Sequence, residues 1–384
     1  MDNNFSIVFV QMQGIKTEKM IGGGLTFLEL LARNLIKRNI RVYAITNSRD
    51  KYGFDFLANN RFIANFNTNP NGLLSMFFFD YTTMKNELHR IIDKLPKNCI
   101  FISVDPFPRD IFSTYYIKRY LQQNTIITMH HITPSIFFHP FRRGFSRTII
   151  AWLMSVFALF IIKTSQIPVF LDNKRIAAST GWRLDHLLME MPLTVNIPIK
   201  NPNNKYNQIA CFIGRLNPNK GITDLIYSWR LVNRSIPDAK LYIIGGNVAK
   251  DKYQKLLNRL NMNNTIKITG YLSESEKNQI ISMSSLFVFP SYEEGWSLAV
   301  MEAINYGLLP ILYDIPAYYY VCNDKIKVPP GNIKELSTKI VYFLNNPEKV
   351  ANTVRILQMC SKKYSEDYVF DVWFNQIKEK FNLT

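Results

Sequence analysis

The sequence has few cysteines and histidines, and it lacks the spacings that these residues show at metal sites. Its four cysteines stand far apart and its five histidines form no ligand pattern, so we expect no bound metal and no cofactor. The unpaired cysteines indicate a reduced compartment, and only a short apolar run follows Asp2, so no signal peptide is expected. The sequence thus predicts a cytoplasmic protein with reduced thiols. The cysteines are Cys99, Cys211, Cys322 and Cys360.

Acidic residues are also scarce, since 29 Asp and Glu stand against 46 Lys and Arg and the formal net charge is +17 at pH 7. Such an excess favours anionic partners: nucleotide diphosphates, nucleic acid or an anionic membrane. The aromatic residues are not interleaved with basic ones in any recognisable nucleic-acid module, so no nucleic-acid partner is expected. The chain of 384 residues, 47% of them hydrophobic, is long enough for two folded domains.

No apolar run is long enough to span a membrane, which takes about 20 residues. The longest, residues 149–162, follows a basic stretch, so the segment from Arg142 to Ile162 combines positive charge with apolar length. Two interpretations stay open. The segment is an interfacial helix that meets the anionic inner face of a membrane, or it is a buried helix with a solvated basic end.

Segments with strand and helix patterns alternate along both halves of the chain, which predicts an α/β fold with parallel, doubly wound sheets. The region 50–82 gives no clear pattern. The expected strands cover residues 6–10, 41–46, 99–104, 125–129, 208–214, 239–245, 265–268, 286–289 and 309–313. The expected helices cover residues 25–38, 110–121, 221–232, 251–260 and 367–381, with more helix from about 332 onward. The polar stretch 196–207 is the expected linker between two Rossmann-like domains.

Two glutamates flank the start of a helix in the second half. Glu294 lies in the loop after the strand 286–289, and Glu302 lies over a turn into a helix that begins near Ser297. The free N–H groups of a first helical turn bind phosphate, and carboxylates beside them can accept hydrogen bonds from sugar hydroxyls. This pattern suggests a nucleotide sugar that lies across the helix N-terminus.

A basic loop precedes this motif, at residues 214–221. Arg215 and Lys220 stand on a turn that follows a strand, where both cations can converge on one diphosphate. Negative charge builds on that diphosphate as its bond to the sugar breaks, so the two cations would stabilise the leaving group.

Together these motifs resemble the retaining GT-B glycosyltransferases of family 4 (group 1). The resemblance is carried by Pro290-Ser291, Glu294-Gly295-Trp296, Glu302-Ala303 and Gly307-Leu308-Leu309-Pro310, in register after the basic loop. It implies a GT-B fold, with two Rossmann-like domains that face an interdomain cleft. The implied enzyme is a retaining hexosyltransferase that moves a sugar from a nucleotide-sugar donor to a glycan or lipid-linked acceptor. Because the sequence has no Asp-x-Asp motif, the metal-dependent GT-A type is disfavoured.

The resemblance also implies roles for single residues. The catalytic set would be Arg215, Lys220, Glu294 and His130, and the donor-binding set would be Gly23, Gly24, Gly214, Trp296, Ser297, Leu298, Ala299 and Glu302. Glu294 would hold the hydroxyls of the donor sugar and Glu302 those of the ribose. Alternatives stay open for the glycines, which would otherwise form a flexible loop, and for His130, which would otherwise cap a turn.

The resemblance further implies a domain plan, and the sequence departs from the family in two places. Residues 1–196 would form the acceptor-side domain, 197–364 the nucleotide-sugar domain, and 365–384 a helix that packs back on the first. Residues 315–320, with sequence Ile-Pro-Ala-Tyr-Tyr-Tyr, stand where the family commonly has Gly-Gly and an acid. Ser297 replaces a common glycine, a change that a helix N-cap should tolerate.

Two other functions compete with this interpretation. One is a nucleotide-sugar epimerase of the same fold, which needs no acceptor. The other is a non-catalytic basic protein that binds membrane or nucleic acid.

Overall fold

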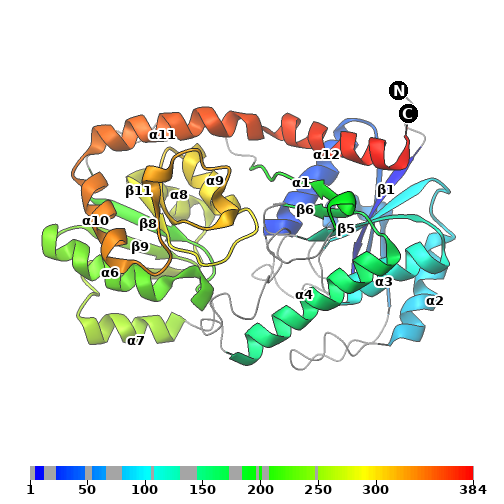
Figure 1. Ribbon diagram of the computed structural model, residues 1–384, viewed down its shortest axis with the longest axis horizontal. Helices are drawn as coiled ribbons and strands as arrows, with labels where there is room; N and C mark the ends of the chain where they lie inside the picture. Colours follow the sequence, from blue (N-terminus) through cyan, green and yellow to red (C-terminus); the bar gives the residue numbers. More distant parts are fainter. Residues whose placement is uncertain are drawn as a thin grey trace. The chain divides into compact units, whose positions relative to one another are not determined.

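The computed structural model describes residues 5–12, 23–47, 54–65, 80–104, 108–129, 145–172, 184–195, 199–200, 207–246 and 250–383. The chain forms two compact units, whose elements are labelled in Figure 1. The first unit consists of Met1–Phe138, Ser146–Leu193 and Asp367–Thr384. The second consists of His139–Phe145 and Thr194–Glu366.

The first unit contains a parallel sheet of seven strands in the order β3-β2-β1-β4-β5-β6-β7. Its inner strands are continuous apolar runs, as expected for a sheet that is covered on both faces. Ile7, Val8, Phe9 and Val10 of β1, for example, are each 0% exposed. The strands are β1 (Ser6–Gln11), β2 (Arg41–Asn47), β3 (Arg61–Ala64), β4 (Cys99–Ser103), β5 (Asn124–Met129), β6 (Val169–Leu171) and β7 (Leu188–Glu190).

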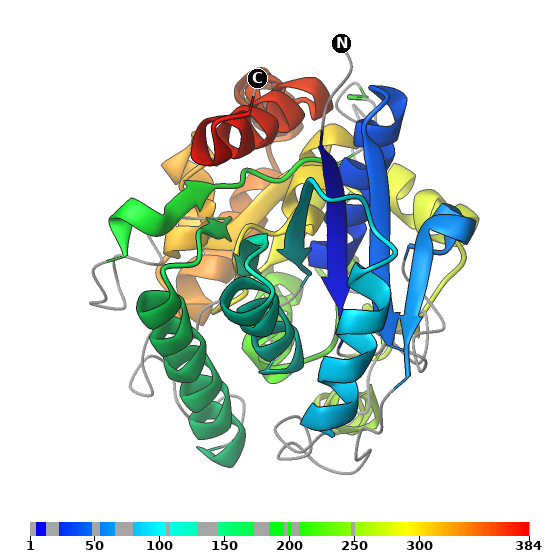
Figure 2. The same cartoon turned by 90° about the vertical axis from the view of Figure 1, so that its right-hand side faces the viewer.

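Helices cover both faces of this sheet. Figure 2 shows α2, α3 and α4 on one face and α1 on the other, as right-handed crossovers require. The last helix of the chain also packs on this unit: Trp373 stacks on Phe170 with ring centres 5.7 Å apart, and the Gln376 amide exchanges two hydrogen bonds with the backbone of Glu190. The helices are α1 (Gly23–Lys37), α2 (Tyr81–Ile92), α3 (Pro108–Tyr120), α4 (Phe145–Ser165) and α12 (Glu366–Phe381).

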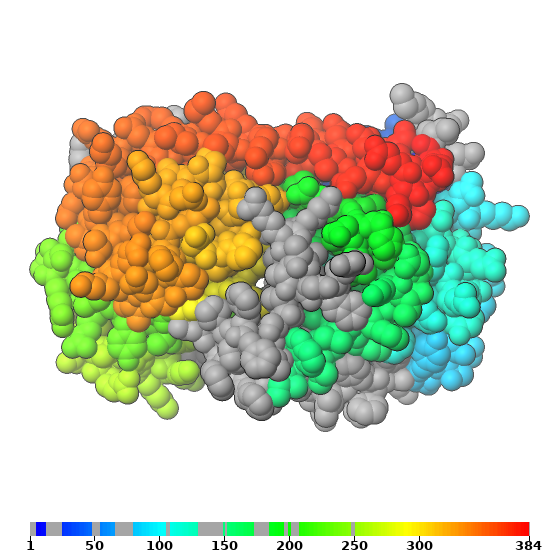
Figure 3. Space-filling view, viewed as in Figure 1, coloured from blue at the N-terminus to red at the C-terminus, as the bar shows by residue number. Residues whose placement is uncertain are grey.

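The second unit contains a parallel sheet of six strands in the order β10-β9-β8-β11-β12-β13. Its strands are β8 (Ile209–Ile213), β9 (Lys240–Ile244), β10 (Ile266–Gly270), β11 (Leu286–Phe289), β12 (Leu309–Tyr313) and β13 (Lys327–Val328). Its helices are α6 (Ile222–Ser235), α7 (Lys250–Leu260), α8 (Glu274–Met283), α9 (Leu298–Asn305), α10 (Ile333–Leu344) and α11 (Pro347–Ser361). In the space-filling view of Figure 3, α10 and α11 form part of the surface of this unit.

Two doubly wound parallel-sheet domains confirm the predicted fold class. Strands β11 and β12 have the predicted bounds, because each is a buried apolar run, the first closed by Pro290 and Ser291 and the second by Asp314. The strands that sequence reasoning missed are short: β3, β6, β7 and β13 have two to four residues each. The predicted linker lies largely outside the described residues.

The cysteines differ from expectation. Cys322 and Cys360 form a disulfide across a sequence separation of 38, so the expectation of reduced thiols is wrong for this pair. No local spacing reveals a bond that the fold makes between a loop and the end of α11. Cys99 and Cys211 are buried free thiols, and burial raises their pKa values to about 11 and about 12, which leaves them unreactive.

Helix α4 contains most of the basic apolar segment. Its C-terminal part joins the core through Ala158, Leu159 and Ile162, but Leu153 and Phe160 are 49% and 57% exposed. Arg142 lies outside the described residues. Among the helices that the structure describes, none is long and apolar enough to cross a membrane. Both interpretations of this segment therefore stay open.

Candidate active site

The candidate site lies where the strand order of the second sheet reverses. Strands β8 and β11 are neighbours in the middle of the sheet, and their chains continue to opposite sides of it. Ligands of doubly wound sheets bind outside the carboxyl ends of the strands at such a switch point. The basic loop 214–221 follows β8, and the loop that carries Glu294 follows β11. The fold therefore brings both predicted motifs to one edge of the sheet.

Backbone contacts lock the two loops together. The Tyr292 amide donates to the Asn219 carbonyl oxygen at 2.8 Å. Gly221 has φ +69°, and a Cβ atom on it would lie 2.0 Å from the carbonyl oxygen of Pro290. A side chain at this position would therefore push the loops apart, which explains why the basic loop ends in glycine.

Lys220 and Glu294, from the two loops, form an ion pair with Nζ and Oε1 2.5 Å apart. Both side chains are largely shielded, at 15% and 10% exposed. The ammonium group also lies 5.6 Å from the centre of the Phe289 ring at the end of β11. Arg215, in contrast, is exposed at the start of the basic loop. One predicted cation is thus held in place by a predicted sugar-binding carboxylate, while the other projects into solvent.

A buried cluster beneath the loops was missed by sequence reasoning. The Asp224 carboxylate accepts hydrogen bonds from the hydroxyls of Tyr292 and Tyr313, the second at 2.8 Å. Burial and the neighbouring Asp224 charge raise the pKa of Tyr313, so its hydroxyl stays a donor. The cluster anchors the loop that carries Glu294. Asp224 stands in the first turn of α6, where an acid is common, so its sequence position gave no distinctive signal.

The start of α9 follows Glu294. Its N-cap residue Ser297 has φ 78° and ψ 87°, a left-handed conformation, and its side chain makes no capping hydrogen bond. Serine thus stands at the N-cap, as expected, but its side chain does not cap the helix. A non-glycine residue in this region costs about 1 kcal/mol or more, because its Cβ crowds the following carbonyl. Leu298 and Ala299 form the half-buried first turn, and the Trp296 side chain is 1% exposed, packed beneath it.

Glu302 lies one turn further along α9, half-buried. Burial raises the pKa of its carboxyl group, while the positive charge of Lys277 on α8 acts in the opposite direction. Burial lowers the pKa of Lys277, but its hydrogen bond to Glu274 and the charge of Glu302 outweigh burial, so that pKa is raised. Glu302 is therefore a shielded acceptor beside a charged lysine.

Four predicted residues remain. Gly214 lies in the second unit, and Gly23, Gly24 and His130 belong to the first. Gly214 directly follows β8, and its amide donates to the carbonyl oxygen of Ile244 at 3.0 Å. Gly23 and Gly24 form the start of α1, and His130 lies outside the described residues, so their roles stay predictions. In the part of the chain that the structure describes, no three His, Cys, Asp or Glu side chains gather as a metal site would require.

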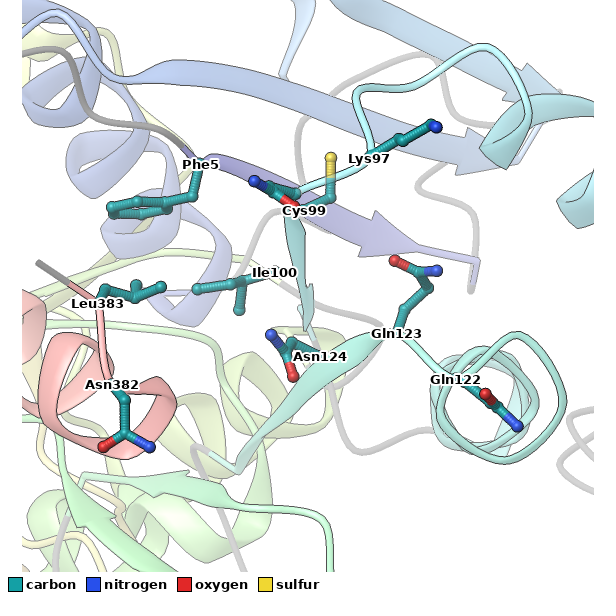
Figure 4. Close-up of a pocket in the computed structure, with 10 residues that line it drawn as sticks. Phe5, Lys97, Cys99, Ile100, Gln122, Gln123, Asn124, Asn382 and Leu383 are labelled. Atoms are coloured by element: carbon teal, nitrogen blue, oxygen red, sulfur yellow. The ribbon is translucent and has the colours of Figure 1, made fainter.

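A separate cavity of about 430 Å³ lies in the first unit, at the amino ends of β4 and β5 (Figure 4). Phe5, Ile100 and Leu383 supply its apolar wall, and Asn124 and Lys97 are among its polar residues. It lies at the edge of the sheet opposite to that where doubly wound folds bind their ligands. It is therefore not part of the candidate site.

Comparison with known proteins agrees with the motifs. Residues 195–356 match the model of the family described as Glycosyl transferases group 1. An uncharacterized glycosyltransferase of Methanocaldococcus jannaschii is 39% identical over 102 residues, which are 27% of this chain and 25% of that relative. The poly(glycerol-phosphate) alpha-glucosyltransferase of Bacillus subtilis is 24% identical over 240 residues, which are 60% of this chain and 34% of that relative. The chain spans about a quarter to about half the length of the first curated relatives that it matches.

The likeness to solved structures extends over nearly the whole chain. HepE from Anabaena, in complex with UDP and glucose, is similar with a TM-score of 0.73 at 15% identity, over 98% of this chain and 99% of that chain. At such identity the likeness shows the fold alone. The chain therefore has the GT-B fold, and its second unit is similar to the group 1 glycosyl transferases.

Proposed function

We propose that this protein is a glycosyltransferase that moves a sugar from a nucleotide-sugar donor to a glycan or lipid-linked acceptor. The observation that carries the proposal is the meeting of two motifs at the switch point of the second sheet. The basic loop and the two-glutamate loop share backbone contacts there, and Lys220 pairs with Glu294 at 2.5 Å. The match of residues 195–356 to group 1 glycosyl transferases supports the same reaction class.

In this proposal, different site residues bind different parts of the donor. The first-turn amides of α9 and the cations Arg215 and Lys220 would bind the diphosphate and stabilise it as it leaves. Glu302 would accept hydrogen bonds from the ribose hydroxyls, and Glu294 from the hydroxyls of the transferred sugar. With donor bound, Lys220 would lie between the diphosphate and Glu294, and its charge would keep the carboxylate from repelling the phosphates.

We further propose a metal-independent hexosyl transfer with retention of configuration. Sequence reasoning found no residue for a double displacement, so the acceptor would attack the front face while the leaving phosphate takes its proton. The alpha linkage in the name of the Bacillus relative and the UDP and glucose in the HepE complex are consistent with an alpha-linked hexose donor. Lipid-linked acceptors would be met where α4 exposes Leu153 and Phe160 beside a basic stretch.

Ligand-dependent thermal unfolding tests the donor site. UDP, GDP, ADP and their sugar conjugates are added in turn, and the matching ligand at about 100 times its Kd should add about 2.7 kcal/mol to the free energy of unfolding. The shift should be lost in Glu302→Ala. If no nucleotide stabilises the wild type, the donor site is not where we place it.

Turnover with the stabilising donor then tests the reaction. Arg215→Ala should lower the rate of transfer without changing the unfolding temperature, since Arg215 is exposed. Incubation without acceptor separates transfer from epimerisation, because an epimerase converts the nucleotide sugar alone. Accumulation of an epimer under those conditions would replace the transferase proposal with the epimerase.

A further inference from the structure

Residues 315–320, which depart from the family pattern, place two tyrosines against the candidate site. Tyr318 is 0% and Tyr320 is 5% exposed. Burial raises the pKa values of both well above the ordinary value, and the nearby Glu294 carboxylate raises them further. Tyr320 therefore keeps its proton at neutral pH and is a constant hydrogen-bond donor beside the proposed donor-sugar carboxylate.

The Tyr320 hydroxyl holds the backbone at the start of α9. It donates a hydrogen bond that is shared between the carbonyl oxygens of Trp296, at 2.9 Å, and Ser297, at 3.2 Å. A trans peptide is planar, so the carbonyl of Ser297 and the N–H of Leu298 point in opposite directions within one plane. The hydroxyl that fixes the two carbonyls thereby fixes the directions of the Ser297 and Leu298 N–H groups.

This part of the backbone needs an external support. Ser297 has φ 78° without the freedom of glycine, and its side chain makes no capping hydrogen bond that would hold the turn. The Ser297 carbonyl also accepts from the Val300 amide at 3.2 Å, within α9 itself, and the support from outside the helix comes from a residue 23 positions further along the chain.

The tyrosine ring is itself fixed. Tyr320 stacks on Trp296 with ring centres 4.3 Å apart and an interplanar angle of 7°, and Tyr364 meets both rings edge-on. Two residues beyond Tyr320, Cys322 is bonded to Cys360 at the end of α11, four positions before Tyr364. Stacking and a covalent link thus hold the hydroxyl donor in register with the turn.

We propose that Tyr320 is a positioning residue that aims the first N–H groups of α9 at the diphosphate of the donor. This inference rests on the proposed function, since it takes the α9 start as the diphosphate site. It goes beyond that function because it assigns to the Tyr-rich segment the task of holding the left-handed turn at Ser297.

The first test compares two hydroxyl deletions in one aromatic cluster. Tyr320→Phe keeps the ring stack and removes the shared donor, whereas Tyr364→Phe keeps the edge contacts and is the matched control. Dissociation constants are measured for UDP, GDP and ADP and for the corresponding nucleosides, which lack phosphate. For the nucleoside diphosphate that the wild type binds, Tyr320→Phe should raise the dissociation constant by about three- to tenfold. The dissociation constant of the corresponding nucleoside should stay unchanged. An equal loss for both, or the same loss in Tyr364→Phe, would overturn the assignment.

A second measurement works without a ligand. Amide hydrogen exchange is followed in a peptide that covers residues 296–301, in the folded wild type and in both variants. Tyr320→Phe should speed exchange there several-fold relative to Tyr364→Phe, and equal rates would contradict the proposal. If the wild type binds no nucleoside diphosphate, the proposed function fails, whereas unchanged exchange in Tyr320→Phe sinks only the role of Tyr320.

Discussion

Two helices of the second unit follow a serine, and the two serines play different roles. Ser273, before α8, has extended backbone; its hydroxyl accepts a hydrogen bond from the Glu276 amide, and its own amide donates one to the Glu276 carboxylate. Ser297, before α9, has left-handed backbone and caps nothing with its side chain. Serine at the same position therefore closes one helix start and leaves the other available.

The comparison shows which of the two helix starts has its backbone N–H groups satisfied by side chains of the protein. A capping box satisfies the first N–H groups with the chain's own side chains, so such a helix start has little left for a ligand. At α9, Tyr320 holds the Ser297 carbonyl, and Gly221 packs against the backbone of the loop that leads to the helix. In the proposed function, the N–H groups of this turn would then remain available for the diphosphate.

The largest expected effect comes from pushing the two loops apart. Gly221→Ala would place a methyl group against the Pro290 carbonyl in a left-handed backbone, and we expect a loss of about 4 kcal/mol in the free energy of unfolding. Gly270→Ala is the matched control, because Gly270 has φ +79° but its added Cβ would meet only the Lys250 amine at 3.3 Å. It should lose about 1 kcal/mol. Denaturant unfolding measures both, and equal losses would mean that the contact between the loops carries no weight.

The disulfide supports α9 from further away. Cys322→Ser removes a link across 38 positions, and the chain-entropy model gives a loss of about 4 kcal/mol at most, less where the unfolded chain keeps structure. Unfolding with and without a reductant should reproduce this difference in the wild type and show none in the variant. A wild type indifferent to reductant, with both thiols free by mass spectrometry, would contradict the bond.

The elements that depend on a local pattern of residues could be predicted from the sequence. The runs 286–289 and 309–313 are apolar, the first closed by Pro290 and Ser291 and the second by Asp314, so β11 and β12 could be placed residue by residue. The contacts that support the site could not be predicted, because they join residues that are far apart in the sequence. Tyr320 with Ser297, Asp224 with Tyr292 and Cys322 with Cys360 meet only once the sheet has formed.

The pH dependence of binding sharpens the contrast on α9 itself. Burial raises the pKa of Glu302 above its ordinary 4.5, so on acidification the carboxylate that would accept from ribose is lost at a higher pH than for an exposed glutamate. Affinity for the nucleotide sugar should fall through that range. Glu302→Gln should lower the affinity at neutral pH by about tenfold and abolish the further fall of affinity on acidification.

The stability of the ligand-free protein should respond with the opposite sign. For an acid with a raised pKa, the favourable contribution is present below the unfolded value and is lost as the pH rises through the folded one. Glu87 and Glu276 have lowered pKa values and act on the total stability in the opposite sense, so the Glu302 contribution is taken as the difference in unfolding free energy between the wild type and Glu302→Gln. Across the same acidic range, affinity and this difference should move in opposite directions. Parallel curves would show that another group controls binding.

The smallest effect separates the two serines directly. Ser273→Ala removes a capping box and should cost about 1 kcal/mol of unfolding free energy. Ser297→Ala removes no cap, and alanine meets the same left-handed crowding as serine, so its cost should stay well below that and be limited to the interaction of the serine hydroxyl with that of Tyr318. Paired denaturant titrations resolve such a difference. If Ser297→Ala costs as much as Ser273→Ala, the serine itself closes the start of α9, and the amides that we assign to the diphosphate are already in use.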